Sequence, residues 1–330
     1  MASTAIPVIL LTGFLGSGKT SLLRRLIRQP EFAQCAVVIN EFGDIGLDQA
    51  LVSDQSDDRD IQLLDSGCLC CMASTSIQDT LASLYYRRLR EEIPWFDTVL
   101  IETSGLAEPG PIVNALYGDD TLNRKFRLAG IVTTFDAGFG KSQVDAYREA
   151  KLQLMMADVI VITKGDVHGA VDELSTQLGA MHPTARIITN QLDDAVLART
   201  IRQTDEYRPA NERTPVAAAP PPALPALRHV LAYGIYSVSV RIPEPVSWEM
   251  WAGFVRHVQR DFGDALLRFK GILAFHGEPR PMAVHGIHHL FSPPVPVDAA
   301  GDTIGSVVFI VRELERERID AAVTHLLSFP

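Results

Sequence analysis

The chain has 330 residues, of which 47% are hydrophobic and 21% are charged. This length suits one large domain or two ordinary ones, and the apolar fraction allows a sizeable core, which argues against wholesale disorder and against collagen-like or coiled-coil structure. The 30 lysines and arginines against 40 aspartates and glutamates give a formal net charge of -10, so a protein that coats nucleic acid is not expected.

The hydrophobic and cysteine patterns restrict the compartment. No apolar run reaches the roughly 18 residues that a membrane-spanning helix needs, and the short apolar N-terminal stretch lacks a basic leader and a cleavage site. The four cysteines are too few for a disulfide framework, and Cys68, Cys70 and Cys71 lie within four positions. Such crowding favours metal or redox chemistry in a reducing compartment, so we expect a cytoplasmic protein with no membrane partner.

Up to about residue 207, strand-like apolar runs alternate with segments of helical spacing. This alternation predicts an α/β fold with a parallel sheet covered by helices on both faces. The predicted strands are Pro7–Leu11, Ala36–Ile39, Thr98–Ile101, Ala129–Thr133, Val159–Thr163 and Arg186–Thr189, and the predicted helices include Leu22–Ile27, Thr80–Leu89 and Val144–Met155. Residues 1–207 are therefore predicted to form the first domain.

Residues 208–228 are rich in proline and alanine, which predicts an extended linker rather than an ordered loop within one domain. Residues 229–330 then predict a smaller C-terminal α+β domain, with helices on one face of a mostly antiparallel sheet. Its expected elements are a strand at His229–Arg241, a helix at Trp248–Phe269, strands at Ile272–Phe275, Met282–His289 and Ser306–Arg312, and a helix at Glu315–Leu327.

Residues 13–20 match the phosphate-binding pattern G-x-x-x-x-G-K-[ST] between a predicted strand and a predicted helix. Glycines let the backbone curl so that successive N–H groups face phosphates, and the helix that begins near Gly18 adds its positive end. Lys19 is suited to reach the β- and γ-phosphates, and the Thr20 hydroxyl is suited to ligate Mg²⁺. We therefore expect a P-loop NTPase fold. The predicted nucleotide contacts in this loop are Gly13, Gly16, Ser17, Gly18, Lys19, Thr20 and Ser21.

A P-loop needs a second acidic group near its metal, and Glu102 follows the predicted strand Thr98–Ile101. Sheets of this kind place ligand-binding residues at strand ends, so the Glu102 carboxylate would face Mg²⁺ through a water molecule. The alternative is that Glu102 merely caps a helix. Together with Lys19 and Thr20, Glu102 is our predicted catalytic set.

Thr163-Lys164-Gly165-Asp166 follows another predicted strand and resembles the guanine-reading motif N-K-x-D, with threonine in place of asparagine. The Asp166 carboxylate is able to accept hydrogen bonds from the N1–H and 2-amino groups of guanine, a donor pair that adenine lacks. The aliphatic part of Lys164 is able to lie across the base. Thr163, Lys164 and Asp166 therefore predict a GTP site rather than an ATP site.

The distinctive segment of the chain is Gly67-Cys68-Leu69-Cys70-Cys71. Thiolates select Zn²⁺, Cu(I) or similar soft ions, and tetrahedral zinc needs about four ligands. Cys68, Cys70 and Cys71 are our predicted metal ligands, with Glu41 as the candidate oxygen ligand and Asp44 as a weaker one. A redox sensor or incidental buried thiols are the alternatives.

The remaining metal-binding residue types have ordinary interpretations. Cys35 lies at the start of a predicted strand and is expected in the core. His285, His288 and His289 are expected as surface or core residues, because on one strand His288 would point away from the other two.

Taken together, these motifs resemble the CobW-like GTPases, the metallochaperone branch of the class that also contains the urease and hydrogenase maturation GTPases. The resemblance covers nearly the whole chain. It rests on Gly13–Thr20, Asn40–Asp44, Gly67–Cys71, Glu102–Pro109, Thr163–Asp166 and, in the second domain, Arg268–Gly271.

The resemblance implies GTP hydrolysis coupled to binding of a transition metal, zinc or else cobalt or iron, and its delivery to a client metalloprotein. Where many members carry a His-rich run near the linker, this chain has proline and alanine, which puts metal storage in doubt.

We expect the γ-phosphate to order Asn40–Asp44 and Glu102–Gly105, which would change the spacing of the thiolates between them. No arginine finger is evident, so slow basal turnover is expected, from a monomer or a metal-dependent dimer. The competing hypotheses are a P-loop ATPase or kinase with structural cysteines, and a metal or redox sensor that uses nucleotide as a structural ligand.

Overall fold

The computed structural model describes residues 5–40, 61–63, 69–72, 76–169, 171–204, 234–299 and 301–328, with the backbone alone for 61–63, 69–72, Asp120, Asp302 and Ser328. The chain divides into two compact units, residues 1–175 with 186–206, and residues 176–185 with 207–330. The predicted linker at 208–228 lies outside the described residues, so the predicted domain boundaries stay predictions. Within the described ranges, no helix has both the length and the apolar character needed to cross a membrane.

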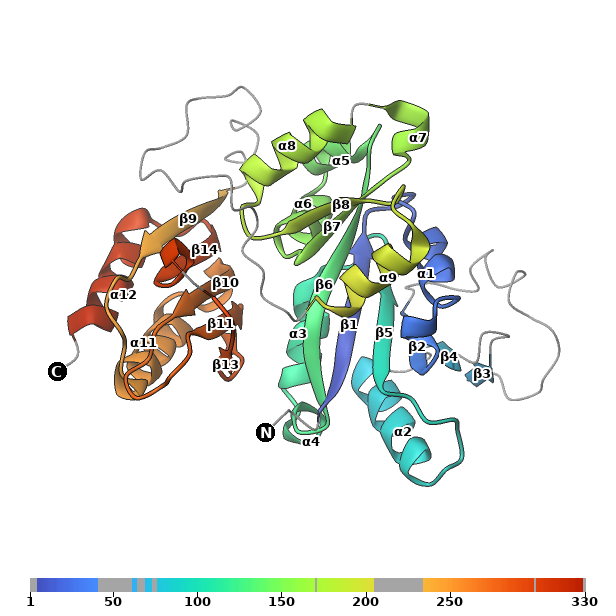
Figure 1. The fold of residues 1–330 in the computed structure, drawn as a ribbon, viewed down its shortest axis with the longest axis horizontal. Helices are drawn as coiled ribbons and strands as arrows, with labels where there is room; N and C mark the ends of the chain where they lie inside the picture. Colours follow the sequence, from blue (N-terminus) through green and yellow to red (C-terminus); the bar gives the residue numbers. More distant parts are fainter. Residues whose placement is uncertain are drawn as a thin grey trace. The chain divides into compact units, whose positions relative to one another are not determined.

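The N-terminal unit is built on one large sheet, labelled in Figure 1. In chain order, the helices and strands described up to residue 204 are β1 (Ile6–Gly13), α1 (Lys19–Leu26), β2 (Cys35–Asn40), β3 (Ile61–Leu63), β4 (Leu69–Met72), α2 (Ile77–Leu89), β5 (Thr98–Thr103), α3 (Pro109–Tyr117), α4 (Asp120–Asn123), β6 (Phe126–Asp136), α5 (Gly140–Ala146), α6 (Arg148–Met155), β7 (Val159–Thr163), α7 (Gly165–His168), α8 (Val171–Met181), β8 (Arg186–Thr189) and α9 (Asp194–Arg202). In the described part of the chain the sheet has eight strands in the order β3-β4-β2-β5-β1-β6-β7-β8. Its neighbouring strands run parallel, except that β3 is antiparallel to β4. The predicted α/β fold is confirmed.

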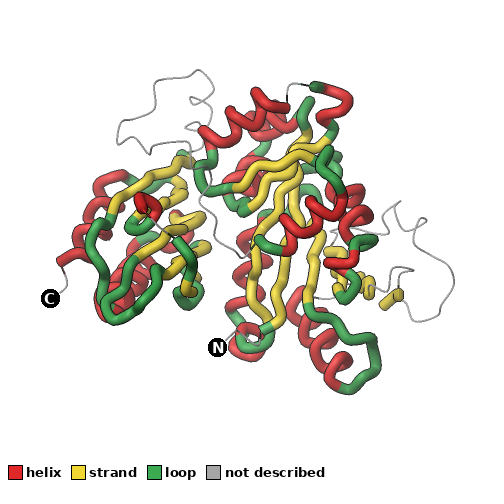
Figure 2. Tube along the Cα trace, viewed as in Figure 1, coloured by secondary structure: helices red, strands yellow, loops and turns green. Residues whose placement is uncertain are grey.

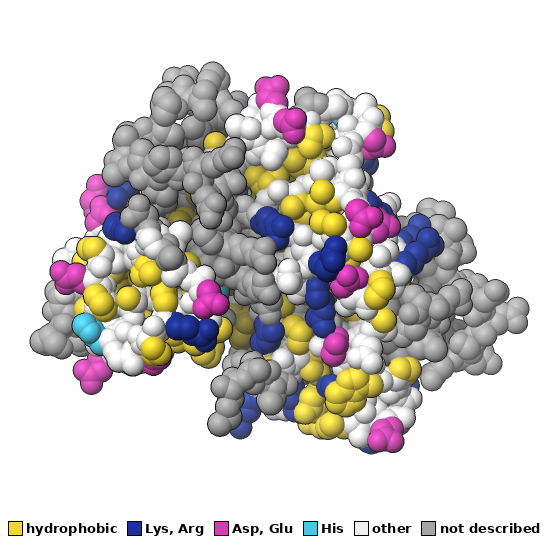
Figure 3. All heavy atoms as spheres, viewed as in Figure 1, with side chains coloured by type: hydrophobic (Ala, Val, Ile, Leu, Met, Phe, Trp, Pro, Cys, Tyr) yellow, Lys and Arg dark blue, Asp and Glu magenta, His cyan; other side chains and the backbone are white. Residues whose placement is uncertain are grey.

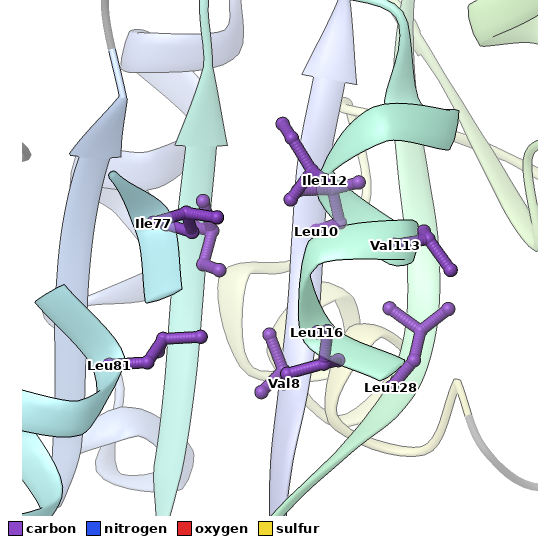
Figure 4. A pocket seen from close by; sticks show the side chains of 9 residues that line it. Val8, Leu10, Ile77, Leu81, Ile112, Val113, Leu116 and Leu128 are labelled. Atoms are coloured by element: carbon purple, nitrogen blue, oxygen red, sulfur yellow. The ribbon is translucent and has the colours of Figure 1, made fainter. Parts of the chain in front are cut away.

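Successive side chains of the central strand β1 point to opposite faces of the sheet. Ile9 and Leu11 pack with residues of α1 and α9 in one core cluster. Val8 and Leu10 lie on the other face, where side chains of α2, α3 and the sheet line an apolar cavity of about 10 Å³ (Figure 4). A void of this size and lining stays dry, so hydrophobic contact covers both faces of the sheet.

The surface over α1 and α9 carries charges of both signs, and Figure 3 shows blue and magenta side chains next to one another on this face. Arg25 of α1 pairs with Asp194 of α9, and Arg202 of α9 pairs with Asp97 at 2.8 Å. Partly exposed pairs of this kind contribute about 0–1 kcal/mol each. The apolar cluster beneath them therefore contributes more to holding α9 on the sheet.

The C-terminal unit consists of an antiparallel sheet and helices (Figure 2). The sheet and the helices share one apolar core. Its helices and strands described beyond residue 233 are β9 (Ile235–Arg241), α11 (Trp248–Asp261), β10 (Leu266–Leu273), β11 (Met282–Ile287), β12 (Leu290–Phe291), β13 (Val295–Pro296), β14 (Ser306–Arg312) and α12 (Arg316–Ser328). The strand order is β12-β11-β10-β14-β9, with β13 paired to β11. Residues of α11, α12 and the sheet pack in one apolar cluster, so the predicted C-terminal α+β fold is confirmed.

The motif Arg268–Gly271 lies on the central strand β10, where packing explains Phe269 and Gly271. Phe269 is fully buried in the core cluster, and Arg268 and Lys270 alternate to the opposite face of the strand. A Cβ atom added to Gly271 would lie 2.4 Å from the Val307 side chain, so the close approach of β14 requires glycine here.

Two helix predictions are wrong in extent. The helix predicted over Trp248–Phe269 ends at Asp261, because Gly263 adopts a φ of 51° and the residues from Leu266 onward pair as β10. The strand predicted at Ile272–Phe275 is the end of β10, which stops at Leu273. The helix predicted at Val144–Met155 is two helices, α5 and α6. They are separated by Tyr147, whose backbone is extended.

Candidate functional site

The P-loop joins β1 to α1 at the carboxyl end of the central strand (Figure 1). Gly13, Gly16 and Gly18 have φ values of 142°, 72° and 93°, in the region that glycine adopts without strain. Gly13 is required on a second ground, because an added Cβ atom would lie 2.2 Å from Thr134 Oγ1. The predicted loop therefore has the curled backbone that phosphate binding needs, and Ser21 lies exposed in the first turn of α1.

The polar side chains of the loop bind neighbouring backbone and strand groups. Lys19 is 9% exposed, and its Nζ donates to the carbonyl oxygens of Gly13 at 2.9 Å and Phe14 at 3.2 Å. Ser17 Oγ lies 2.6 Å from Thr134 Oγ1 of β6. The Lys19 ammonium is thus held over the loop that it is predicted to serve.

Thr20 and Glu102 come together although 82 positions separate them in the sequence. Glu102 stands in register with Leu11 of β1, near the carboxyl end of β5, and is 6% exposed. The Thr20 hydroxyl donates to Glu102 Oε1 at 2.7 Å. A hydroxyl and a buried carboxylate form a set of hard oxygen donors, which fits Mg²⁺.

The loop after β5 lies against the P-loop. A Cβ atom added to Gly105 would lie 2.8 Å from the Leu15 backbone nitrogen. Buried Gln153 of α6 donates from Nε2 to the carbonyl oxygens of Gly105 at 3.1 Å and Ala107 at 2.9 Å. The backbone N–H of Ser104 donates to the Asn40 carbonyl at 2.9 Å, so the same loop also contacts the end of β2. Sequence reasoning missed Gln153, because nothing in its neighbours marks it.

The turn after β7 binds the P-loop twice. Thr163 Oγ1 donates to the Ser17 carbonyl at 2.7 Å, and Lys164 Nζ donates to the Gly16 carbonyl at 2.7 Å. Lys164 has a φ of 57° and begins the short helix α7, on which Asp166 is exposed. The structure therefore brings Thr163 and Lys164, two of the three predicted base-binding residues, to the predicted phosphate loop.

Asp136, at the carboxyl end of β6, is a site residue that sequence reasoning missed. It is 1% exposed and accepts a hydrogen bond from Lys164 Nζ at 2.6 Å. Burial alone raises the pKa of the Asp136 carboxyl, but hydrogen bonds from Lys164 and from the amides of Phe139 and Gly138 outweigh burial and lower it. The carboxylate is therefore charged at neutral pH. A carboxylate at a strand end, the same signal that marked Glu102, was available for it.

The predicted thiolate site is described only in part. Cys70 and Cys71 lie on β4, in register with Val37 and Val38 of β2. Their side chains, and the whole of Cys68 and Glu41, lie outside the described residues, as does Asp44. Cys35 is 1% exposed and belongs to the core cluster, which confirms the prediction for it.

The three C-terminal histidines are not arranged as predicted. The strand predicted over Met282–His289 ends at Ile287, and His288 has a φ of 50° in the turn that follows. The expected alternation therefore does not extend to His288. Within the described ranges, no three His, Cys, Asp or Glu residues form a group that could hold a metal ion.

Comparison with known proteins agrees with this arrangement. Residues 7–189 match the family model of the CobW/HypB/UreG nucleotide-binding domain, and residues 235–327 match that of the cobalamin synthesis protein cobW C-terminal domain. The zinc chaperone YjiA of Escherichia coli is 31% identical over 325 residues, which cover 97% of this chain and 98% of YjiA. The zinc chaperone CobW of a Sinorhizobium species is 32% identical over 188 residues, 49% of this chain and 51% of that protein.

Among solved structures, the crystal structure of Zn(II)-bound YjiA GTPase from E. coli matches with a TM-score of 0.72 and 30% identity, over 98% of this chain and 99% of that one. The match extends over both compact units and both family models. The chain therefore belongs to the CobW/HypB/UreG family of nucleotide-binding proteins.

Proposed function

We propose that the chain is a GTP-hydrolysing metal chaperone that binds a transition metal, zinc in the first place, and transfers it to a client metalloprotein. Family membership supports nucleotide binding, and the relative that matches along nearly its whole length is named a zinc chaperone and a GTPase. The observation that carries the proposal is the attachment of both Thr163 and Lys164 to P-loop carbonyls. It would join a turn suited to reading guanine to a loop suited to binding phosphate.

At the phosphate end of the site, the P-loop amides and Lys19 would bind the β- and γ-phosphates. Thr20 and Glu102, whose oxygens are 2.7 Å apart, would hold Mg²⁺, with Glu102 acting through a water molecule. When bound, Mg²⁺ neutralises charge on the phosphate oxygens. The chain's own contribution is position: Gln153 holds the loop after Glu102, and the hydrogen bonds of Lys19 keep its ammonium over the phosphate site.

At the base end, Asp166 would accept hydrogen bonds from the guanine edge and the stem of Lys164 would lie across the base. The exposure of Asp166 supports this role, because its carboxylate is accessible to a ligand. Lys164 is fixed by two oxygen acceptors, the Gly16 carbonyl and Asp136 Oδ2. In an ATPase or kinase, Asp166 would meet no such donor pair, because adenine lacks it.

For the cargo, we propose Cys68, Cys70, Cys71 and Glu41 as ligands, which would complete the four that tetrahedral zinc needs. A backbone route supports coupling to the nucleotide. The strand β4, which carries Cys70 and Cys71, pairs with β2, and the Asn40 carbonyl at the end of β2 accepts from Ser104, two residues beyond Glu102. Ordering of the loop after β5 by nucleotide would therefore reach the strands that border the thiolates.

The test is a zinc titration with and without a non-hydrolysable GTP analogue, on the full chain and on its Cys68→Ala variant. A coupling of about 1–3 kcal/mol predicts a zinc affinity that differs roughly 5- to 150-fold between the two conditions, and only in the unmodified chain. Equal affinities would remove the coupling. A Zn(II)-bound crystal structure exists for a YjiA triple mutant with one glutamate and two cysteines replaced by alanine, so bound zinc alone is too weak a criterion, and affinity is the quantity to compare.

Two further measurements separate the competing hypotheses, and a third identifies the metal. Phosphate release after GTP addition distinguishes an enzyme from a sensor that holds nucleotide as a structural ligand. Displacement of GTP by ATP at equal concentration would favour the ATPase or kinase hypothesis. Metal analysis of anaerobically purified protein, compared with Cys68→Ala, distinguishes zinc from cobalt and iron.

A further inference from the structure

An exposed aromatic ring lies beside the proposed base-reading turn. Phe139 is 59% exposed, and it ends the turn between β6 and α5, three residues after Asp136. Single exposed apolar side chains are common on protein surfaces, so exposure only makes the ring available to a ligand, and the case for a role rests on its position.

The backbone of this turn is held rigidly. Asp136 Oδ1 accepts from the amides of Gly138 at 2.8 Å and Phe139 at 3.0 Å, and the Ala137 amide donates to the Thr163 carbonyl at 2.9 Å. The other carboxylate oxygen, Oδ2, accepts from Lys164. One buried carboxylate therefore fixes both the backbone at Phe139, in the turn after β6, and the side chain of Lys164, directly after β7.

The ring of Phe139 has one aromatic neighbour in the described structure, His168. The two ring centroids are 5.8 Å apart at an interplanar angle of 80°, an edge-to-face contact. His168 ends α7, two residues after Asp166. A Cβ atom added to Gly138 would lie 2.6 Å from His168 Nε2, so glycine lets the imidazole lie close to the turn. The Phe139 ring is thus anchored to the same short helix that carries Asp166.

We propose that Phe139 stacks on the guanine base of the bound nucleotide, and that Asp136 is the positioning residue that fixes Phe139 and Lys164 around the base. The inference rests on the proposed GTP site. Phe139 supplies an aromatic face, Lys164 an aliphatic and cationic one, and Asp166 the hydrogen bonds that distinguish guanine from adenine. Binding of the base covers the exposed ring.

Stacking and hydrogen bonding leave different signatures. Every base has a π-face, so removal of a stacking ring lowers the binding affinity of all nucleotides by a similar factor, about 5- to 150-fold. Removal of a hydrogen-bond acceptor instead changes the ratio between guanine and adenine nucleotides. Tripolyphosphate has no base, so its affinity does not depend on either group.

The experiment measures the affinities of GDP, ADP and tripolyphosphate for the full chain, for Phe139→Ala and for Phe139→Trp. We expect Phe139→Ala to lower the affinities for GDP and ADP by the same factor within that range and to leave the affinity for tripolyphosphate unchanged. Phe139→Trp, which keeps an aromatic ring, should retain the affinities of the unmodified chain. Trp95→Ala is the matched control, because Trp95 is 60% exposed but lies before β5, at the opposite end of the strand from Glu102.

The outcomes are distinguishable. If the full chain binds GDP and Phe139→Ala binds it equally well, the stacking role is overturned and the GTP site stands. If Phe139→Ala weakens GDP and tripolyphosphate alike, Phe139 acts only on the structure of the loop, and the inference fails. If the full chain binds no guanine nucleotide, the proposed function fails, and the inference fails with it.

The role of Asp136 is tested by a double-mutant cycle. Asp136→Asn introduces an amide donor towards either Lys164 or the backbone amides, so the turn is no longer held as it was. We expect Asp136→Asn to lower the affinity for GDP in the unmodified chain, and to lower it by a smaller factor in the Phe139→Ala background. Equal effects in both backgrounds would show that Asp136 does not act through Phe139.

Discussion

The parallel sheet of the N-terminal unit and the antiparallel sheet of the C-terminal unit bury different chemistry. At the carboxyl ends of the parallel strands, polar side chains lie within hydrogen-bond distance of one another, and each pair has at least one buried member. These pairs are Ser17 with Thr134, Thr20 with Glu102, and Lys164 with Asp136. The C-terminal sheet instead buries a cluster of aromatic rings around Phe254 and Phe269.

Strand direction explains the difference. Parallel strands all end at one edge of their sheet, so the polar residues that follow each strand converge there and form a site. Antiparallel neighbours end at opposite edges, and their terminal residues do not converge in this way. Removal of a polar side chain at the strand ends of the first unit can therefore impair its reaction while the fold remains. The second unit depends on the packing of its core.

The largest expected effect is on that packing. Phe254 is fully buried on α11 and contacts four aromatic rings, those of Trp251, Phe269, Phe291 and Phe309. Phe254→Ala should lower the free energy of unfolding of the C-terminal unit by about 3–5 kcal/mol, because it leaves a cavity. Urea unfolding followed by tryptophan fluorescence measures this, since Trp248 and Trp251 both lie on α11.

The comparison requires that nucleotide binding survive this change. GDP affinity of Phe254→Ala should match that of the unmodified chain under conditions where the variant is folded. If Phe254→Ala lowers the free energy of unfolding by less than about 1 kcal/mol, the aromatic cluster repacks and is not the main support of the unit.

The next effect is on the reaction. Lys19→Ala should lower GTP hydrolysis by about 100- to 1000-fold, as removal of one preorganised donor from a charged transition state does elsewhere. The measurement is phosphate release at saturating GTP. Because Lys19→Ala also removes two hydrogen bonds to loop carbonyls, the rates are compared at a temperature where thermal unfolding shows both proteins folded. The matched control is Lys141→Ala, because Lys141 is exposed on α5. Hydrolysis that survives Lys19→Ala would place the reaction elsewhere.

A smaller effect lies between packing and chemistry. Gln153→Ala removes two hydrogen bonds to the carbonyls of Gly105 and Ala107. It should cost about 1–3 kcal/mol of stability, because buried carbonyls lose their donor, and it should slow hydrolysis by releasing the loop after Glu102.

The same residue type offers a control for stability. Gln143 is partly buried on α5 and makes a single long hydrogen bond of 3.4 Å to the Leu15 carbonyl. Gln143→Ala should change the free energy of unfolding by no more than about 0.5 kcal/mol. Equal losses for the two glutamines would contradict the positioning role of Gln153.

How far sequence reasoning reaches is visible in the same residues. The P-loop, the strand end at Glu102 and the turn at Thr163 are each encoded by a short apolar run followed by polar residues, and the structure has them at the carboxyl ends of β1, β5 and β7. Their binding roles stay predictions. The strand-end position of Asp136 could have been predicted in the same way as that of Glu102. Its contact with Lys164, 28 positions away, and the contact of Gln153 with Gly105, 48 positions away, leave no local pattern.

The helix errors have the same origin. Tyr147 interrupts a continuous helical pattern, and its ring stacks on Phe14 of the P-loop with centroids 4.7 Å apart. The run from Leu266 onward keeps helical spacing after α11, but the positive φ of Gly263 ends the helix and strand pairing takes over. In both places a long-range contact or one backbone angle overrides the local period.

The smallest effect that sharpens the comparison is a pH dependence of the C-terminal unit. His257 of α11 bonds to Asp261 at 2.9 Å, and its ring lies 5.0 Å from that of His325 on α12. Burial lowers the pKa of His257, and His325, Arg260 and Arg318 lower it further, against the opposing charge of Asp261.

The unfolded chain therefore binds a proton more tightly than the folded chain, and stability falls as the pH drops through about 6.5, the ordinary histidine value. Burial also lowers the pKa of the partly buried His288, so His257→Gln should reduce this slope without abolishing it. Urea midpoints between about pH 5 and pH 8 measure the slope. An unaltered slope in His257→Gln would mean that the contact between α11 and α12 does not sense protonation.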